Sequence, residues 1–375
     1  MKKIKVLFKM FYLYHKAAYD PLIDLYEKDS NYDVYLSLTH EVEKKFKILK
    51  KDITNKYLNL FEQQGHKISN ENETFDIVFT PDVVNEKKYG DAILCLIYHG
   101  ITFTKTVTYR ELKKHTDSKY FIFLEGEESI NAMEKSGAKG KSELIKIGYP
   151  KMDYYFKKNY YDKNLILKSL GLDPNKKTIL FAPTYKPTCI YEVKDLIFEE
   201  TLDYNLIIKL HHYAWLGKFA SHSQHLVFEN RVEKYPNSII IPKDDYNIMP
   251  LYYVSDTMIS EASGAITEFL ATGKTGIIYD LDNHRQKHSD GESLLTFNNN
   301  EYLNKSFIHV NKNSFGEGIK KALNPTKKMR LAQKKDIDKI FYKLNGEASN
   351  RIKLKIKNIY NKEVEKTENG LQTES

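Results

Sequence analysis

Short apolar runs alternate with longer amphipathic stretches along most of the chain. Alternation of this kind is typical of α/β folds with parallel sheets. In the first half the pattern predicts helices at 19–29, 40–64 and 127–137, and strands at 3–8, 32–38, 75–80, 92–98, 120–125 and 144–150. A second series of strands is predicted at 177–184, 204–212, 238–243, 257–260 and 276–280.

A charged and aromatic segment, residues 151–177, separates the two series and ends in a Gly and Pro turn. We therefore predict two Rossmann-like domains, 1–170 and 171–350, followed by a basic helix and a frayed tail over 351–375. Two such halves resemble the GT-B arrangement, in which the domains face each other across a cleft. Ligands of open α/β sheets bind beyond the carboxyl ends of the strands, so residues that directly follow strands are the first candidates for a site.

Residues 40–58 carry apolar side chains at helical spacing, with lysines crowding the remaining positions. The apolar positions are Val42, Phe46, Leu49, Ile53 and Tyr57. This pattern predicts a basic amphipathic helix. Such a helix lies on an anionic membrane leaflet or packs on its own sheet, and the sequence leaves both alternatives open.

Composition narrows the function classes. The 375 residues include 58 Lys and Arg against 50 Asp and Glu, a formal net charge of +8. That excess does not suggest an architectural nucleic-acid binder, but it suits an enzyme of anionic substrates or a protein held against an anionic membrane. Cys95 and Cys189 lie in apolar stretches without disulfide or metal spacing, so we expect two ordinary, partly buried thiols in a reducing compartment. No leader segment and no uncharged apolar run of about 18 residues is visible, so we expect a cytoplasmic protein.

The stretch 255–280 carries the first candidate site. A predicted strand is followed by a turn of small and polar residues that includes Ser260, Ser263 and Gly264, and then by a helix. Free backbone N–H groups at the start of a helix suit a pyrophosphate, and Glu268 is one turn further, where it could accept hydrogen bonds from ribose hydroxyls. The same residues equally fit a core helix with Ser263 as its N-cap.

Two histidines follow predicted strands. His211 comes directly after the apolar run 205–210, where it can donate to a donor phosphate; His212 points to the other face and is the weaker candidate. His99 follows the strand at 92–98, and Gly100 allows a sharp turn after it. A neutral imidazole at that point is suited to taking a proton from an attacking hydroxyl. Structural roles for both histidines remain open.

Loop residues near these histidines complete the set. Lys105 and the threonines around it could contact phosphate on the acceptor side, and Thr184 and Lys186 follow the first strand of the second series. Solvated loop positions explain them as well. No carboxylate cluster has metal-ligand spacing, so we predict that no metal is essential.

In this order the motifs resemble the CDP-glycerol glycerophosphotransferase family of teichoic acid and capsule synthesis. The resemblance extends over roughly residues 95 to 280. Its five matching segments are His99-Gly100, 147–156, 181–186, 209–212 and 255–269.

This resemblance implies a GT-B fold and transfer of a phosphopolyol from a CDP-activated donor to a hydroxyl of a lipid-linked saccharide or polymer, releasing CMP. It implies an acceptor and membrane side in 1–170, a nucleotide-donor side in 171–350, and a protein peripheral on the inner face of the membrane. It assigns His99 as the base, His211 to the donor phosphates, Ser260, Ser263 and Gly264 to the nucleotide phosphates, and Glu268 to the nucleotide. The donor is a substrate, so no cofactor is implied.

Three alternatives remain open. One is a nucleotide-sugar-dependent GT-B glycosyltransferase of capsule or surface glycan, and another is a sugar-nucleotide epimerase on a similar scaffold. The third is a non-catalytic membrane-bound scaffold, because Glu261-Ala262-Ser263-Gly264 departs from the family's usual residues. The donor identifies which alternative holds.

Overall fold

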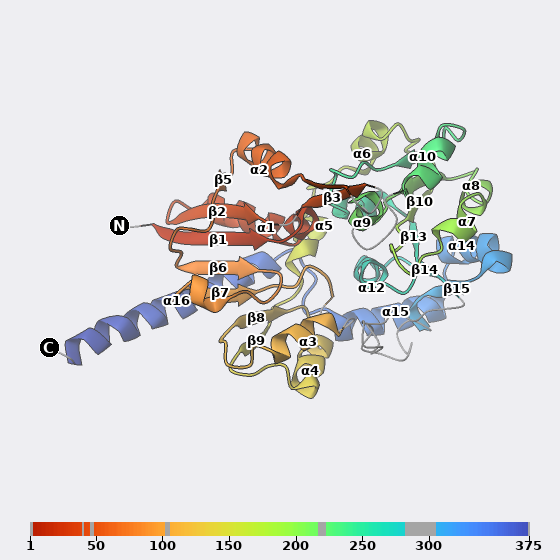
Figure 1. The fold of residues 1–375 in the computed structure, drawn as a ribbon. Helices are drawn as coiled ribbons and strands as arrows, with labels where there is room; N and C mark the ends of the chain where they lie inside the picture. Colours follow the sequence, from red (N-terminus) through yellow and green to blue (C-terminus); the bar gives the residue numbers. More distant parts are fainter. Residues whose placement is uncertain are drawn as a thin grey trace.

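The computed structural model describes residues 3–39, 41–45, 49–101, 106–216, 223–281 and 305–373. It places them in two α/β halves that lie side by side, each built around its own sheet (Figure 1). This arrangement confirms the predicted α/β class with two Rossmann-like halves.

The first half is built around a parallel sheet in the order β5-β2-β1-β6-β7-β8-β9. Its strands are β1 Ile4–Met10, β2 Tyr32–Leu38, β5 Lys67–Ile68, β6 Ile77–Thr80, β7 Ile93–Leu96, β8 Phe121–Leu124 and β9 Glu143–Lys146. Every residue of β6, β7 and β8 is buried, as expected for central parallel strands covered on both faces. The six strands predicted here are confirmed, and the short edge strand β5 is additional.

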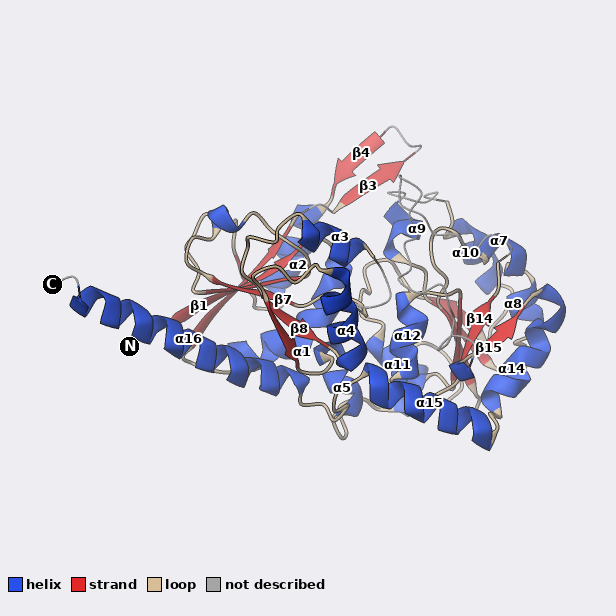
Figure 2. Ribbon diagram, turned by 90° about the horizontal axis from the view of Figure 1, so that it is seen from below, coloured by secondary structure: helices blue, strands red, loops and turns tan. Residues whose placement is uncertain are grey.

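Helices connect these strands and cover the sheet (Figure 2). They are η1 Leu13–His15, α1 Lys16–Glu27, α2 Thr54–Gln63, η2 Glu86–Lys88, α3 Val107–Lys113 and α4 Glu127–Ser136, where η marks a 3₁₀ helix. The first of them, η1, begins three residues after β1 ends. It therefore lies at the carboxyl end of a central strand, where ligands of open sheets bind.

The second half repeats the plan with the parallel order β12-β11-β10-β13-β14-β15. Its strands are β10 Thr178–Phe181, β11 Asn205–Ile208, β12 Ser238–Ile240, β13 Thr257–Ser260, β14 Gly276–Tyr279 and β15 Ile308–Val310. Its helices are α7 Ile190–Val193, α8 Leu196–Glu199, α9 His212–Leu216, α10 Leu226–Val232, α11 Met249–Val254, α12 Gly264–Leu270, η5 Lys312–Ser314 and α14 Phe315–Leu323. The five predicted strands are confirmed, and β15 was not predicted.

The two halves share apolar side chains at their junction, which contains η4 Pro150–Met152, α5 Asp153–Phe156 and α6 Lys163–Ser169. Ile101 follows β7 of the first half yet belongs to the core beneath β10 and β13. Leu216 ends α9 of the second half yet belongs to the core of the first. Residues between 149 and 172 also join the second core, so the division near residue 170 stays a prediction.

The chain ends with α15 Lys327–Ile340 and α16 Ala348–Thr373. Figure 1 shows α16 returning beneath the first sheet. Ile352, Ile356 and Ile359 are buried in the first core, at a spacing that places them on one face of the helix. The predicted closing helix is therefore confirmed, but it continues to Thr373, so the prediction of a frayed tail was wrong for those residues.

The basic amphipathic helix predicted over 40–58 was wrong. The chain forms an antiparallel hairpin of β3 Val42–Lys45 and β4 Leu49–Asp52, which projects beside α9 (Figure 2), and α2 begins only at Thr54. The Ile53 N–H donates to the Glu41 carbonyl over 2.8 Å. Because this bond brings residues twelve positions apart together, the intervening chain has to turn back, which a continuous helix cannot do.

Candidate active site

His99 and His211, predicted from opposite halves, lie around one tyrosine. His99 follows β7 and His211 follows β11, and the Tyr14 ring in η1 contacts both, with centroids 5.3 Å from His99 and 5.8 Å from His211. Both histidines are partly exposed. Each histidine follows the carboxyl end of a parallel strand, so the ring contacts with Tyr14 bring one strand end from each half close together.

The hydrogen bonds of His211 define its tautomer. Its Nδ1 accepts the backbone N–H of Tyr213 over 3.2 Å, so the neutral ring carries its proton on Nε2. The Tyr185 ring, which belongs to the loop after β10, lies 4.6 Å from the His211 ring. His211 therefore presents an N–H donor beside the loop that was predicted to hold the donor.

A third histidine, His15, completes the cluster, and no sequence motif predicted its role. Its ring stacks on His99, with centroids 4.5 Å apart and planes at 23°. It lies 4.6 Å from the Tyr14 ring. His15 is 3% exposed, and burial, with smaller contributions from His212 and Lys151, lowers the pKa of its ring to about 3. A neutral imidazole thus lies against the predicted base.

His212, the weaker candidate, joins the two halves. Its Nε2 lies 2.8 Å from Oε2 of Glu41, which is fully buried. The other carboxylate oxygen of Glu41 accepts the backbone N–H of Leu13. Glu41 therefore connects η1 of the first half with the start of α9 in the second half. Nothing in the sequence pattern around Glu41 predicts this contact.

The loop after β10 is held by a buried carboxylate. Glu261 accepts the backbone N–H groups of Thr184 and Cys189, each over 2.6 Å, and burial raises the pKa of its carboxyl group. The Thr184 hydroxyl donates to the Pro187 carbonyl, so its hydrogen is already engaged within the loop. Lys186 is exposed at the same loop. The donor-binding roles of Thr184 and Lys186 stay predictions.

The turn before α12 is a capped helix start. Ser263 is the N-cap and accepts the Ile266 N–H over 3.3 Å, and its hydroxyl lies 3.0 Å from that of Ser260. Ser260 is fully buried, and a side chain at Gly264 would meet open space. The capping interpretation is thus confirmed, while phosphate binding by Ser260, Ser263 and Gly264 stays a prediction.

Glu268 lies inside a set of hydrogen bonds at the junction. Its carboxylate accepts from the Tyr149 hydroxyl over 2.6 Å and from Lys151 Nζ over 2.9 and 3.0 Å. The Tyr252 hydroxyl is 3.3 Å away, and Glu268 is 3% exposed. A ribose would have to compete with these donors, so the structure gives Glu268 a junction role, and its nucleotide role stays a prediction.

Of the acceptor-side residues, Gly100 is partly exposed and Lys105 lies outside the described residues. A Cβ at Gly100 would meet only the Tyr98 ring at 3.5 Å, an ordinary contact, and its φ is not in the left-handed region. The turn after His99 therefore does not require glycine. Ile101, fully buried in the second core, fixes this loop instead.

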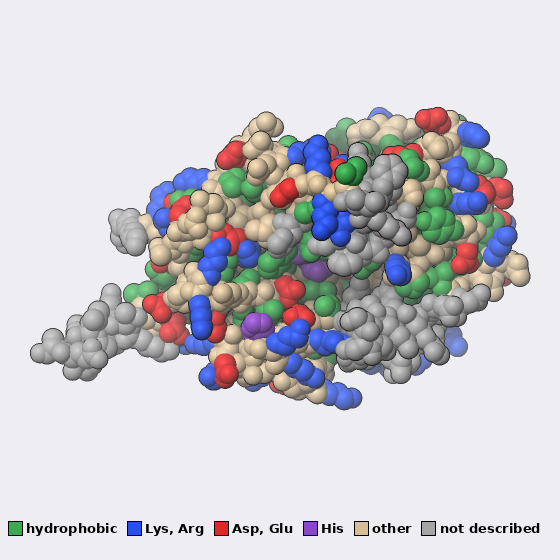
Figure 3. All heavy atoms as spheres, viewed as in Figure 1, with side chains coloured by type: hydrophobic (Ala, Val, Ile, Leu, Met, Phe, Trp, Pro, Cys, Tyr) green, Lys and Arg blue, Asp and Glu red, His purple; other side chains and the backbone are tan. Residues whose placement is uncertain are grey.

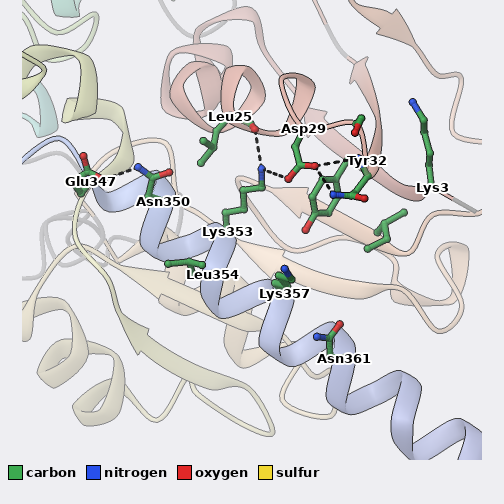
Figure 4. A pocket seen from close by; sticks show the side chains of 13 residues that line it. Lys3, Leu25, Asp29, Tyr32, Glu347, Asn350, Lys353, Leu354, Lys357 and Asn361 are labelled. Carbon is green, nitrogen blue, oxygen red and sulfur yellow. Dashed lines mark hydrogen bonds and ion pairs between the residues drawn. The ribbon is translucent and has the colours of Figure 1, made fainter. Parts of the chain in front are cut away.

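A groove of about 780 Å³ lies elsewhere, between the end of α1, the start of β2 and α16 (Figure 4). Lys353 crosses it, donating to the Leu25 carbonyl over 3.0 Å and pairing with Asp29 over 2.8 Å. Ile4, the first residue of β1, also lines it, so the groove lies at the amino end of the strand whose carboxyl end leads to η1. It is therefore separate from the histidine cluster.

Among the described residues no group of three or more His, Cys, Asp or Glu side chains could hold a metal ion. Cys95 and Cys189 are free thiols, as predicted, and both are fully buried, whereas partial burial was expected. No helix within the described ranges is both long and apolar enough to cross a bilayer.

Comparison with known proteins decides the family. The model of the CDP-Glycerol:Poly(glycerophosphate) glycerophosphotransferase family matches residues 23–358. The chain belongs to this family. This confirms the resemblance drawn from the five motifs, and the match extends well beyond the segment that carried it.

Two curated relatives are 28% identical to parts of the chain. One is the teichoic acid poly(glycerol phosphate) polymerase of Bacillus spizizenii (strain ATCC 23059 / NRRL B-14472 / W23), aligned over 161 residues, 40% of this chain and 38% of the relative. The other is the teichoic acid glycerol-phosphate primase of Bacillus subtilis (strain 168), aligned over 202 residues, 52% of this chain and 48% of the relative. The aligned part thus spans less than half the length of either relative.

Solved structures share the fold over nearly the whole chain. The wall teichoic acid polymerase TagF superposes with a TM-score of 0.66 at 16% identity, covering 97% of this chain and 90% of that chain. A putative UDP-N-acetylglucosamine 2-epimerase from Listeria monocytogenes gives 0.58 at 14% identity, covering 96% and 98%. At such identities the likeness establishes the fold, which is GT-B-like, and nothing finer.

Proposed function

We propose that this glycerophosphotransferase-family protein moves a phosphopolyol, glycerol phosphate or a similar group, from a CDP-activated donor to a hydroxyl of a lipid-linked saccharide or surface polymer. The convergence of His99 and His211 around Tyr14 carries the proposal, because it joins a candidate base from one half to a candidate phosphate ligand from the other. Family membership supports the donor class.

In the proposed reaction the acceptor oxygen attacks the β-phosphorus of the donor in line. The hydroxyl proton passes to His99, an oxygen–phosphorus bond forms, and the bond from the β-phosphorus to the bridging oxygen breaks. The electron pair of that bond leaves with CMP, and His99 later returns the proton to solvent. Phosphoryl transfer of this kind needs little covalent work from the protein, so positioning and charge stabilisation provide most of the acceleration.

His211 is suited to the leaving side of the reaction. Its Nε2–H, fixed by the bond from the Tyr213 N–H to Nδ1, can donate to a donor phosphate as charge develops there. Lys186 is exposed on the neighbouring loop, and we propose that its flexible ammonium contacts the same phosphates as a point charge. We also propose that the turn at Ser260, Ser263 and Gly264 faces these phosphates.

We propose a peripheral location on the cytoplasmic face of the membrane, in capsule or cell-wall polymer synthesis. With the predicted basic helix absent, this location is supported by the net charge of +8 and by the Lys and Arg side chains that lie on both halves of the face in Figure 3. Flotation with vesicles containing phosphatidylglycerol, against vesicles of phosphatidylcholine alone, tests it. Binding that needs the anionic lipid and weakens with salt is expected; failure to float with either vesicle contradicts the location.

A donor assay tests the activity. Purified protein is incubated with CDP-glycerol, CDP-ribitol and a set of UDP-, GDP- and CMP-sugars, with membrane lipid as acceptor, and nucleotide release is followed. CMP release from a CDP-polyol is expected. Since loss of a general base costs about 10²- to 10⁴-fold, His99→Ala is expected to lose that much turnover. His115→Ala, a histidine after α3 and outside the cluster, is the matched control. Release from UDP- or GDP-sugars alone would replace the proposal with glycosyl transfer.

A further inference from the structure

His15 is placed inside the histidine cluster by the first helical turn after β1. It ends η1, stacks on His99 at 4.5 Å, and lies against Tyr14, whose ring also contacts His211. His15 is 3% exposed. Nothing in the sequence pattern or the family description gives this histidine a role. Its position beside the proposed base makes it part of the same site.

The two ring nitrogens of His15 have different surroundings. Nδ1 accepts the backbone N–H of Phe11 over 3.3 Å, so the neutral ring carries its proton on Nε2. Within the part of the chain that the structure describes, the buried Nε2 has no hydrogen-bond partner. Buried polar groups in native proteins are almost always paired, and an unpaired one calls for a specific explanation.

A ligand is the explanation that fits this position. The ring presents one N–H, from the nitrogen that does not contact the backbone, and the ring itself stacks on the residue proposed to activate the acceptor. Burial holds the pKa of His15 near 3, so the ring stays neutral at physiological pH and acts as a hydrogen-bond donor rather than as an acid or base. The partner it suits is therefore an oxygen that accepts a hydrogen bond.

We propose that His15 donates from Nε2 to a non-bridging oxygen of the phosphoryl group under attack. This inference rests on the proposed function. During transfer, charge accumulates on the non-bridging oxygens while the acceptor oxygen–phosphorus bond forms and the bond to CMP breaks. A preformed donor that is itself removed from water, as His15 is, stabilises that charge without reorganisation. His15 from the first half and His211 from the second would then contribute equivalent Nε2–H donors on the two sides of the reaction.

Three substitutions test the role of the Nε2–H donor separately from the role of the ring and from the contact of Nδ1 with the backbone. His15→Asn keeps an acceptor near the Nδ1 position for the Phe11 N–H but has no group at Nε2. His15→Gln reaches the Nε2 position with an amide N–H. His15→Phe keeps a ring against His99 and has neither nitrogen. Each is compared with wild type for CMP release from CDP-glycerol, with thermal unfolding measured in parallel.

We expect His15→Asn and His15→Phe to lower kcat by about 100-fold, with the KM for CDP-glycerol changed by less than about threefold, because the donor acts mainly in the transition state. His15→Gln is expected to recover at least about tenfold of that loss. The pH at which kcat/KM rises should stay the same in all three, because His99 remains the base. Wild-type kcat in His15→Asn, or kcat in His15→Gln no higher than in His15→Asn, would overturn the proposal.

A measurement of ligand binding at His15 tests its donor role independently of CMP release. Histidine-side-chain ¹⁵N NMR, with His15 assigned by its loss in His15→Asn, follows Nε2 during titration with CDP-glycerol and, in parallel, with inorganic phosphate. A shifted Nε2–H resonance supports the donor role even if wild type releases no CMP, an outcome that would remove the proposed function alone. An Nε2 resonance unmoved by both probes overturns the role of His15.

Discussion

Acidification should destabilise the fold through His15. The pKa of this ring is about 3 in the folded protein, against an ordinary value of 6.5, because burial disfavours the charged form. Between these values the unfolded chain binds a proton that the folded chain does not. The contribution of the neutral His15 ring to the unfolding free energy is thus fully present above pH 6.5 and is lost as the pH falls toward 3. From pH 7 to pH 5 the loss amounts to about 2 kcal/mol of unfolding free energy.

Urea unfolding at pH 7 and pH 5 measures this loss. Wild type is compared with His15→Asn, which keeps an acceptor for the Phe11 N–H and does not titrate, and with His115→Ala as a control for removing a histidine outside the cluster. The unfolding free energy of wild type should fall by about 2 kcal/mol more than that of His15→Asn between pH 7 and pH 5, because only wild type has the titrating ring at position 15. Equal losses in the two proteins would show that the His15 ring is not kept neutral by burial.

Three further predictions concern the surroundings of the cluster. Glu261→Gln should lower the unfolding free energy by about 1–3 kcal/mol in urea unfolding and raise the KM for CDP-glycerol, because one of its two backbone N–H partners, at Thr184 and Cys189, loses its acceptor. Lys151→Met should cost about 3–5 kcal/mol by leaving the Glu268 carboxylate buried without its cation. The double variant with Glu268→Gln should cost less than the sum of the single changes, and simple additivity would contradict the coupling. EDTA should leave CMP release unchanged, and a loss restored by a divalent cation would show that the proposed mechanism lacks a metal.

Most of the fold could be predicted from periodicity. The buried parallel strands are short apolar runs, such as β7 and β13, and such runs can be recognised as strands from the local sequence alone. The hairpin of β3 and β4 could not be predicted this way. Its apolar residues recur at helical spacing, but the chain path is set by the Ile53 to Glu41 backbone bond and by the contact between Glu41 and His212 of the other half. Long-range contacts of this kind overrode the local pattern.

The site could be predicted only in part, because some of its residues follow buried strands and others are brought in by long-range contacts. His99 and His211 each come three residues after the end of a buried strand, so the rule for strand ends identifies both. His15 ends a helical turn five residues beyond β1, and the same rule, extended by one turn, would have included it. The contacts of Glu268 with Tyr149 and Lys151 carry no sequence signal, because those residues lie more than 110 positions apart in the chain.

We propose that His99 and His211, brought together from two halves, perform transfer from a CDP-activated polyol. The most direct measurement is the rate of CMP release from CDP-glycerol by wild type, His99→Ala, His211→Ala and His115→Ala, with donor binding followed by thermal shift. On this proposal, CMP release falls by at least about 100-fold in the first two variants and not in the third. Release that persists in both His99→Ala and His211→Ala, or a wild type that stays inactive with every CDP-polyol, would contradict it.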